Sequence, residues 1–527
     1  MIQPSHPGDP ARRLVVLAAV CLAALAMPLA FSGGAVATPA IGRDLGGSAV
    51  AMNWITNAFM LAFGSLLMAA GTLADRYGRK RIFAWGVAGF TLSSLALGFA
   101  PSIVVVDLLR GAQGMAAAAA LAGGTAALAQ EFDGHARTRA FSTLGATFGI
   151  GLAFGPVIAG GLIAQFGWRA IFATGAVAGA LSLVFGVPRM RESRDPHARQ
   201  LDLAGTLTFT AALTAFTCGV IEAPTRGWTS APVLALLAAC AVCALAFVAV
   251  ETRVARPMLD LSLFRYPRFV GVQVLPIATC YGYIVLLVML PLRFIGIDGV
   301  SETHAGLLML ALSAPMLVMP FIAAALTRWL SAGVISGIGL TIAAAGLLAL
   351  GATLHDVGDA TSASAGWATW AMIALGVGAG LPWGLMDGLS VSVVPKSRAG
   401  MATGIFSTTR VAGEGIALAV VNALLAALAQ GHLHALTTHA DTATLNAAAA
   451  RLATGDLANA SALLPGVAHA ALQASYRTAF GVLLQVLAGI TLVCALAAFA
   501  FLARVRAQDE WRDAQACEVG EIRTSAP

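Results

Sequence analysis

The chain has 527 residues, of which only 11% are charged and 58% are hydrophobic, whereas ordinary soluble globular chains carry roughly 25% charged residues. This imbalance excludes a string of soluble domains and predicts an integral membrane protein. The net charge of +6 does not indicate a nucleic-acid partner, because the basic residues are scattered through short connections and form no continuous basic face.

The N-terminal segment ends in two arginines, Arg12 and Arg13, and an apolar run over 14–35 follows it. A cleaved signal peptide with a site near "AVA" is one interpretation, but the run is too long for a signal core and more such runs follow. We therefore expect an uncleaved first membrane helix.

Runs of about 20 apolar residues, the length needed to cross a bilayer, predict an all-α polytopic fold with fourteen transmembrane helices. They cover 14–35, 50–72, 82–100, 103–129, 141–165, 170–187, 203–221, 231–250, 269–292, 305–327, 333–354, 365–394, 400–429 and 480–502. The predicted organisation is an N-terminal six-helix bundle (1–187), a linker (188–202), two additional helices (203–250), a second linker (251–268), a C-terminal six-helix bundle (269–504) and a tail (505–527).

Most of the 31 Lys and Arg residues fall in alternate connections and in the tails. The positive-inside rule therefore predicts a bacterial inner-membrane protein with both termini and both linkers in the cytoplasm. The one long outer connection, near 430–476, contains His432, His434 and His439 without the spacing that stacks metal ligands on a helix. We expect a solvated periplasmic loop there, with no metal site and no cofactor.

The stretch "GTLADRYGRK" (71–80) concentrates charge in a short connection between two apolar runs. Gly71 and Gly78 allow a tight turn, Asp75 can accept hydrogen bonds from a helix N-terminus, and Arg79 can hold the same carboxylate from the other side. These residues, with Arg76 and Lys80, can form a conformational latch. The alternative is a simple cytoplasmic anchor, which leaves Asp75 unexplained.

This stretch resembles the signature between the second and third helices of the major facilitator superfamily, and every specified position agrees. In "LLRGAQGMAAAA", Arg110 and Gln113 match the family's arginine motif. In "GIGLAFGPVIAGG", Gly151, Gly155, Pro156 and Gly160 match the antiporter motif, with Ala159 where a glycine is common. The count of fourteen helices, with the stretch "SRDPHARQLDLAG" before the seventh and "RPMLDLSLF" before the ninth, narrows the resemblance to the fourteen-spanning drug:proton antiporter branch.

The antiporter-motif helix also has a simpler interpretation. Small residues at Gly145, Gly149, Gly151, Gly155 and Ala159 would let a neighbouring helix approach closely. A specific role in preventing proton leak and an ordinary helix contact both remain open.

Ionisable groups within spans are functional candidates, because burying a charge in a bilayer is costly. Arg110 has Asp107 one turn before it, which allows a local ion pair or a role toward a proton-carrying carboxylate or substrate. Glu414 has Arg410 four residues earlier, which allows a structural pair or a coupling switch. Asp387 has no cation within one helical turn in sequence, so burial would favour its protonated form, and it is the preferred proton-coupling carboxylate. The alternative is that Asp387 lies near enough to the cytoplasmic end of its helix to be solvated.

One departure from the family pattern affects the mechanism. Drug exporters of the fourteen-spanning branch carry an aspartate and an asparagine late in the first helix, where this chain has Ala30 and Ala35. Either the coupling carboxylate has moved to Asp387 or Glu414, or the protein is not proton driven in the usual way.

The resemblance implies a secondary active transporter that exchanges protons for drugs or other amphipathic small molecules by alternating access. Transport of one defined metabolite or organic anion, bound by Arg110 or Arg410, is the alternative. An enzyme is disfavoured because no HExxH, GxSxG or paired His and Asp motif occurs, and a channel because no filter segment is visible. Expected partners are the substrate, protons and the bilayer, and the sequence leaves open a monomer or an association with a periplasmic adaptor protein.

Overall fold

A computed structural model describes residues 10–132, 134–194, 202–254, 259, 261–354, 363–394, 399–437 and 441–502. All regular secondary structure in these ranges is helical, in agreement with the predicted all-α class. The predicted tail 505–527 and His439 lie outside the described residues, as do positions 195–201 of the first predicted linker and 255–258 and 260 of the second.

The chain divides into two compact units, each described here by itself. Unit 1 comprises Met1–Met258, Leu287–Leu310 and Leu418–Tyr476, and unit 2 comprises Leu259–Leu286, Ala311–Ala417 and Arg477–Pro527. Unit 1 therefore contains two segments, 287–310 and 418–476, that the sequence analysis places in the C-terminal bundle. The six-helix bundles with the boundaries given above stay a prediction.

Unit 1 is built mainly from the first eight long helices. They are α1 (Pro10–Leu45), α2 (Ala49–Tyr77), α3 (Arg79–Leu97), α4 (Ile103–Glu131), α5 (Gly134–Phe166), α6 (Arg169–Leu181), α7 (Leu203–Arg226) and α8 (Ala231–Arg253), with short turns η1 (Ser182–Gly186) and η2 (Val187–Arg189) after α6. The turn η5 (Leu292–Ile297) and the helices α16 (Thr442–Ala453) and α17 (Leu457–Leu463) complete it.

Unit 2 contains η3 (Leu261–Arg265), α9 (Pro267–Thr279), η4 (Cys280–Ile284), α12 (Pro315–Leu326), α13 (Ala332–Thr353) and α14 (Ala363–Ser392). Four further helices have residues in both units, namely α10 (Val285–Pro291), α11 (Glu302–Ser313), α15 (Ala399–Leu436) and α18 (His469–Leu502).

Helix starts follow local capping chemistry. The side chains of Ser48, Ser102 and Ser331 accept hydrogen bonds from backbone N–H groups in the first turns of α2, α4 and α13, and Asp202 does the same for α7. These caps satisfy N–H groups that have no partner inside a helix. Gly78 separates α2 from α3 with a φ of 122°, a conformation that favours glycine.

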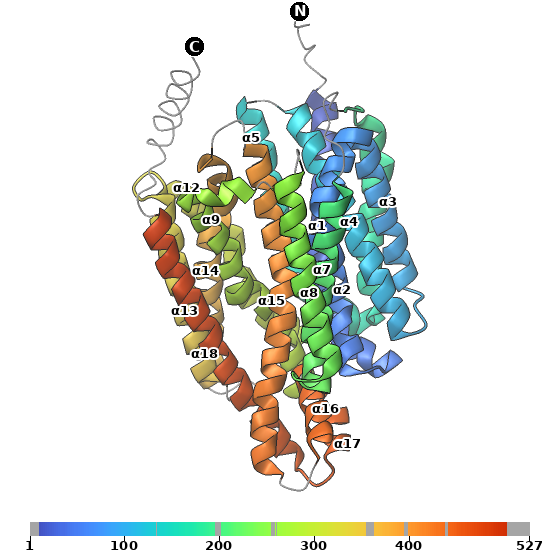
Figure 1. Cartoon of the computed structure of the whole chain (residues 1–527), viewed down its shortest axis with the longest axis vertical. Helices are drawn as coiled ribbons and strands as arrows, with labels where there is room; N and C mark the ends of the chain where they lie inside the picture. Colours follow the sequence, from blue (N-terminus) through green and yellow to red (C-terminus); the bar gives the residue numbers. More distant parts are fainter. Residues whose placement is uncertain are drawn as a thin grey trace, which may run out of the picture. The chain divides into compact units, whose positions relative to one another are not determined.

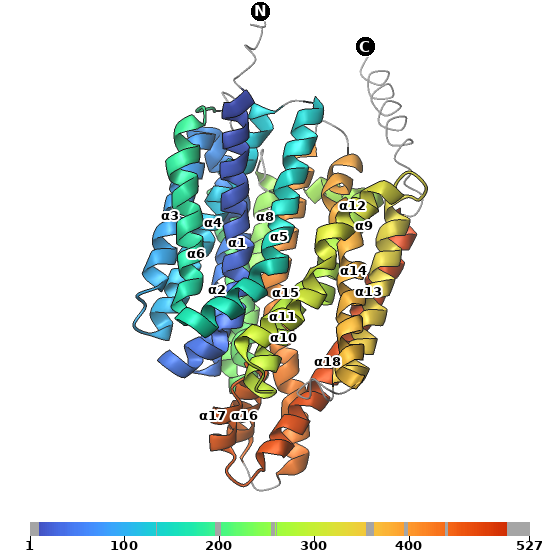
Figure 2. The same cartoon turned by 180° about the vertical axis from the view of Figure 1, so that it is seen from behind.

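Thirteen helical segments of the described chain are long and apolar enough to cross a membrane. The predicted third segment is not among them: α3 has 19 residues and begins with Arg79, Lys80 and Arg81. It nevertheless runs alongside α4 within unit 1 (Figures 1 and 2). The count of fourteen stays a prediction, and α3 is the helix that decides it.

Glycines bring the helices of unit 1 into close contact. A Cβ atom on Gly86 of α3 would collide with the backbone of Ala120 on α4, and one on Gly114 of α4 would collide with the carbonyl oxygen of Phe59 on α2. Small residues at such points allow backbone-to-backbone packing, which is how helices associate without a hydrophobic driving force inside a bilayer.

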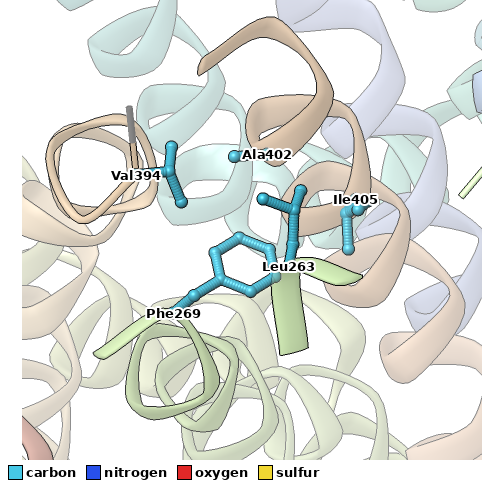
Figure 3. Close-up of a cluster of buried hydrophobic side chains, with 5 residues drawn as sticks. All are labelled: Leu263, Phe269, Val394, Ala402 and Ile405. Atoms are coloured by element: carbon cyan, nitrogen blue, oxygen red, sulfur yellow. The ribbon is translucent and has the colours of Figure 1, made fainter. Parts of the chain in front are cut away.

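Unit 2 has its own packed regions. Five buried side chains from η3, α9, the residues just after α14 and the start of α15 form one cluster, shown in Figure 3: Leu263, Phe269, Val394, Ala402 and Ile405. Elsewhere, Gly339 on α13 and Gly378 on α14 allow these two helices to approach closely. Together these contacts fix α14 and α15, which carry the ionisable candidates of this unit.

The segment predicted as a solvated loop near 430–476 is largely helical. Leu445, Ala448 and Leu452 of α16 are fully buried, and α16 packs against α7 within unit 1. The prediction of a solvated loop is wrong, because apolar residues recur there at helical spacing and form a buried face. The placement of this segment on the outer side of the membrane stays a prediction.

Candidate functional site

Arg110 lies on α4 with its side chain fully buried inside unit 1. Its Nε atom donates a hydrogen bond to the carbonyl oxygen of Ile55 on α2 at 2.8 Å, and its Nη1 atom donates to Gln113 Oε1 at 2.6 Å. Gln113 Nε2 donates in turn to Ser94 Oγ on α3 at 2.8 Å. The arginine motif therefore joins three helices through one polar network.

No carboxylate forms an ion pair with Arg110 among the described residues, and its Nη2 atom is buried without a hydrogen-bond partner there. A Cβ atom placed on Gly34 of α1 would lie 3.2 Å from Nη2. The local pair with Asp107 that the sequence allows does not form, because the guanidinium reaches toward α1 and α2 instead. Arg110 is thus a buried cation that keeps an unused donor.

Arg410 on α15 pairs with Asp387 on α14. Its Nη1 atom lies 3.1 Å from Asp387 Oδ1, with the two side chains 15% and 60% exposed. The rings of Trp383 and Phe406 lie 5.8 and 5.7 Å from the guanidinium carbon. The expectation that Asp387 is buried without a cation is wrong, because its side chain is largely exposed and its partner comes from another helix.

Glu414, one turn beyond Arg410 on α15, is only 6% exposed. Its carboxylate makes no hydrogen bond or ion pair with any residue that the structure describes. The π-helical turn η4 lies beside this turn of α15, where Cys280 Sγ is 3.8 Å from the carbonyl oxygen of Arg410. Single π-turns inside helices are frequent at functional sites.

The predicted latch residues lie at one end of unit 1. Arg79 donates from Nε and Nη2 to Asp75 Oδ1, at 3.0 and 2.9 Å, and from Nη1 to Gln130 Oε1 on α4 at 3.3 Å. The Lys80 backbone N–H donates to Glu192 Oε1, in the chain that follows α6, at 3.2 Å. The cluster thus connects α2, α3, α4 and the segment that follows α6, and its role as a conformational latch stays a proposal.

The antiporter-motif helix α5 packs against α1 through two of its glycines. A Cβ atom on Gly151 would lie 2.5 Å from Pro28 Cγ, and one on Gly155 would collide with Ser32 Oγ. A Cβ atom on Gly145 or Gly149 would meet no atom within 4 Å, so the prediction of close contact is wrong at these two positions. Pro156 lies inside α5, and Ala159 is buried.

Gly160, the last residue of the antiporter motif, faces a different neighbour. A Cβ atom there would collide with the carbonyl oxygen of Glu302 at the start of α11, within unit 1. Glu302 also pairs with Arg43 near the end of α1 at 2.6 Å. This end of α5 is therefore held against α11 by backbone contact.

The sequence analysis missed a buried ion pair. Arg293 Nε lies 3.1 Å from Asp298 Oδ2, and the two side chains are only 2% and 1% exposed. The predicted span 269–292 ends one residue before Arg293, but Arg293 belongs to η5, a helical turn that continues the apolar run. The signal available in the sequence was its position directly after that run, although Pro291 two residues earlier is also compatible with a turn.

Comparison with known proteins agrees with this architecture. The sequence model of the Major Facilitator Superfamily matches residues 20–418. Multidrug resistance protein Stp of Mycobacterium tuberculosis is 34% identical over 394 residues, which cover 74% of this chain and 72% of that protein. The tetracenomycin C resistance and export protein of Streptomyces glaucescens is 29% identical over 413 residues, covering 78% and 75%.

A further relative extends over more of the chain, and solved structures support the fold. The cephamycin export protein CmcT of Amycolatopsis lactamdurans is 31% identical over 448 residues, covering 82% of this chain and 90% of that protein. A bacterial homologue of the human lysosomal transporter Spinster, in an inward-facing conformation, matches with a TM-score of 0.58 at 16% identity, covering 94% and 99%. A peptide transporter POT structure gives 0.58 at 14% identity, covering 95% and 97%. This multi-pass, all-helical chain belongs to the Major Facilitator Superfamily.

Proposed function

We propose that the protein exports drugs or other amphipathic small molecules across the bacterial inner membrane by alternating access, driven by protons that move inward. The names of the relatives support the export direction, because Stp is a multidrug resistance protein and two others are export proteins. The basic residues of the alternate connections support an orientation with both termini in the cytoplasm.

The buried carboxylate of Glu414, which has no ion-pair partner among the described residues, is the observation that supports coupling of export to proton movement. A carboxylate without a hydrogen-bond partner in a low-dielectric region can be stabilised by binding a proton. The charge of Glu414 then affects Arg410, which lies one helical turn away. When Glu414 is charged, it competes with Asp387 for the guanidinium, and when it is neutral, the pair between Arg410 and Asp387 is undisturbed. Glu414 is therefore the preferred proton carrier, ahead of Asp387.

A second candidate function is transport of one specific organic anion. It is favoured by Arg110, whose Nη2 atom is buried and has no partner among the described residues. A substrate carboxylate could supply the missing acceptor, since arginine binds carboxylates through paired N–H groups. A clear preference for carboxylated over neutral substrates would favour this function.

The coupling is tested with purified protein in liposomes, by measuring accumulation of amphipathic compounds, uncharged or singly charged, under an imposed pH gradient. We expect Glu414→Gln to lower gradient-driven accumulation at least tenfold, while exchange of substrate for substrate without a gradient continues. Continued exchange would show that the variant is folded. We expect Asp387→Asn to weaken transport but to keep its dependence on the gradient.

Glu222→Gln is the matched control, because Glu222 pairs with Arg226 four residues later on α7, at 2.6 Å, outside the candidate cluster. It should retain both activities. Gradient-driven accumulation by Glu414→Gln at the wild-type rate would contradict the role of Glu414, and wild-type transport that ignores the gradient would contradict proton coupling itself.

A further inference from the structure

The segment that leads into α9 is fixed to unit 2 by a buried side chain. Leu263 of the turn η3 is fully buried in the cluster of Figure 3, which it forms with Phe269, Val394, Ala402 and Ile405. The Tyr266 backbone N–H donates to the carbonyl oxygen of Leu263 at 3.1 Å, and Pro267 begins α9 with a backbone angle that its ring restricts. This part of the second predicted linker therefore has a defined shape.

Four exposed residues of the same segment form what we call the η3 surface: Phe264, Arg265, Tyr266 and Arg268. Phe264 and Tyr266 are 41% and 39% exposed. The ring of Phe264 also packs edge-on against the buried ring of Phe269, with 5.6 Å between the ring centroids. The η3 surface thus combines two half-exposed aromatic rings with two guanidinium groups.

The η3 surface lies at the start of a membrane span. This span covers Pro267–Ile297, so Arg265 and Tyr266 directly precede it and Arg268 is its second residue. Tyrosine and arginine side chains at the end of a span are typical of the headgroup region of a bilayer. A lipid headgroup is therefore the ligand that this position brings within reach.

The charge of the segment favours an anionic headgroup. In the sequence of residues 252–268, four arginines outnumber one acidic residue, Asp260. Within the part of the chain that the structure describes, Arg265 has no ion pair. A guanidinium has five N–H donors and can bind a phosphate through two of them at once. Arg265 and Arg268 are separated by at most about 10 Å of chain, so both can reach one headgroup.

We propose that the η3 surface binds the headgroup of an anionic phospholipid, such as phosphatidylglycerol, from the surrounding bilayer. The guanidinium groups of Arg265 and Arg268 bind the phosphate, and the rings of Phe264 and Tyr266 contact the glycerol and upper acyl region. A zwitterionic headgroup binds less tightly, because its own cation is repelled by the two arginines. The inference concerns a lipid partner and does not depend on the export or the proton coupling proposed above.

The bound lipid would also stabilise the junction of two functional helices. Leu263 of η3 contacts the cluster that contains Val394, just after α14, and Ile405 of α15. The same two helices carry Asp387 and Arg410. A ligand that binds only the folded state raises the stability of that state, so lipid binding can be followed by thermal unfolding as well as by mass.

The test is native mass spectrometry of the purified full-length protein in detergent, with added phosphatidylglycerol or phosphatidylcholine of the same acyl chains. We expect the wild type to retain about tenfold more phosphatidylglycerol, and the double variant Arg265→Gln, Arg268→Gln to retain the two lipids within about twofold of each other. Each single variant should show an intermediate preference. Phosphatidylglycerol should raise the midpoint of thermal unfolding of the wild type but not that of the double variant.

Arg328→Gln is the matched control. Arg328 is also exposed and precedes an exposed aromatic residue, Trp329, in the connection between α12 and α13 of the same unit. The neighbouring sequence contains no second arginine, so this position cannot bind a phosphate through two guanidinium groups. The variant should keep the wild-type preference for phosphatidylglycerol.

A wild type without preference for phosphatidylglycerol, or a double variant that keeps the full preference, would overturn the proposal. An equal loss of preference in Arg328→Gln would also overturn it, because the lipid would then respond to total positive charge and not to the η3 surface. The same spectra report oligomers. A wild-type dimer that dissociates in the double variant would assign the η3 surface to a second copy of the chain instead of a lipid.

Discussion

Gln113 holds the buried guanidinium of Arg110 by accepting one hydrogen bond and donating another to Ser94. Gln113→Leu would remove the only described acceptor of Arg110 Nη1 and leave a charged donor buried, so we expect the free energy of unfolding to fall by about 1–3 kcal/mol. The change is measured by thermal unfolding in detergent, with transport assayed in parallel.

Ser94→Ala is the control variant for Gln113→Leu. It removes the hydroxyl that accepts from Gln113 and leaves the hydrogen bond between Arg110 and Gln113 in place. Its expected cost is smaller, about 1 kcal/mol, the net value of one neutral hydrogen bond. Equal costs for the two variants would mean that the guanidinium is satisfied in some other way, and that the arginine network is not organised through Gln113.

Individual residues also show where sequence reasoning reaches its limit. Arg110, Arg410 and Glu414 could be chosen from sequence, because charges inside apolar runs are rare enough to stand out. Gln113, which bonds to Arg110, lies at helical spacing and was visible in the motif, but the partner of Arg410 could not be chosen in this way. The partner of Arg410 lies 23 positions away on α14, and no pattern within one helix contains that information.

On α5, two glycines six positions apart have opposite surroundings, and this gives a test of helix packing. Gly155→Ala would place a Cβ atom on Ser32 Oγ of α1, and such overpacking costs about 1–3 kcal/mol. We expect a lower midpoint of thermal unfolding and less folded protein by size-exclusion chromatography.

Gly149→Ala is the companion variant on the same helix, because its Cβ atom would meet nothing within 4 Å. It should be neutral or stabilising by about 0.4–1 kcal/mol, since alanine restricts the unfolded chain more than glycine does. If Gly149→Ala were as damaging as Gly155→Ala, the packing of α1 against α5 would not be the cause.

The helices α3 and α16 show that sequence patterns also have a limited power to predict whole helices. The sequence correctly predicts that an apolar segment follows the charged stretch, and α3 forms there, but its basic first turn keeps it outside the set of clear membrane spans. For α16, polar and histidine-rich flanks suggested a loop, although Leu445 and Leu452 already had helical spacing. Burial against α7 is what stabilises that helix, and it is a tertiary contact.

The topology of the whole molecule is tested with a membrane-impermeant maleimide on a Cys517→Ser background, using Arg191→Cys and Ala462→Cys. Both positions are exposed in the described chain, in the connection after α6 and in α17. With both termini in the cytoplasm, intact cells should label Ala462→Cys and leave Arg191→Cys unlabelled until the membrane is permeabilised. The reverse pattern would invert the orientation that the positive-inside rule predicts.

The sequence by itself determined the membrane environment, the apolar segments, the superfamily and the ionisable candidates, because hydrophobic length, charge placement and short motifs are properties of consecutive residues. Only the tertiary structure decided which charges pair, which glycines touch a neighbouring helix and which polar atoms are buried without a partner among the described residues. The physical reason is that contacts between helices depend on how each helix is rotated about its axis and on the side chains of the opposite helix. The spacing of residues along a single helix determines neither.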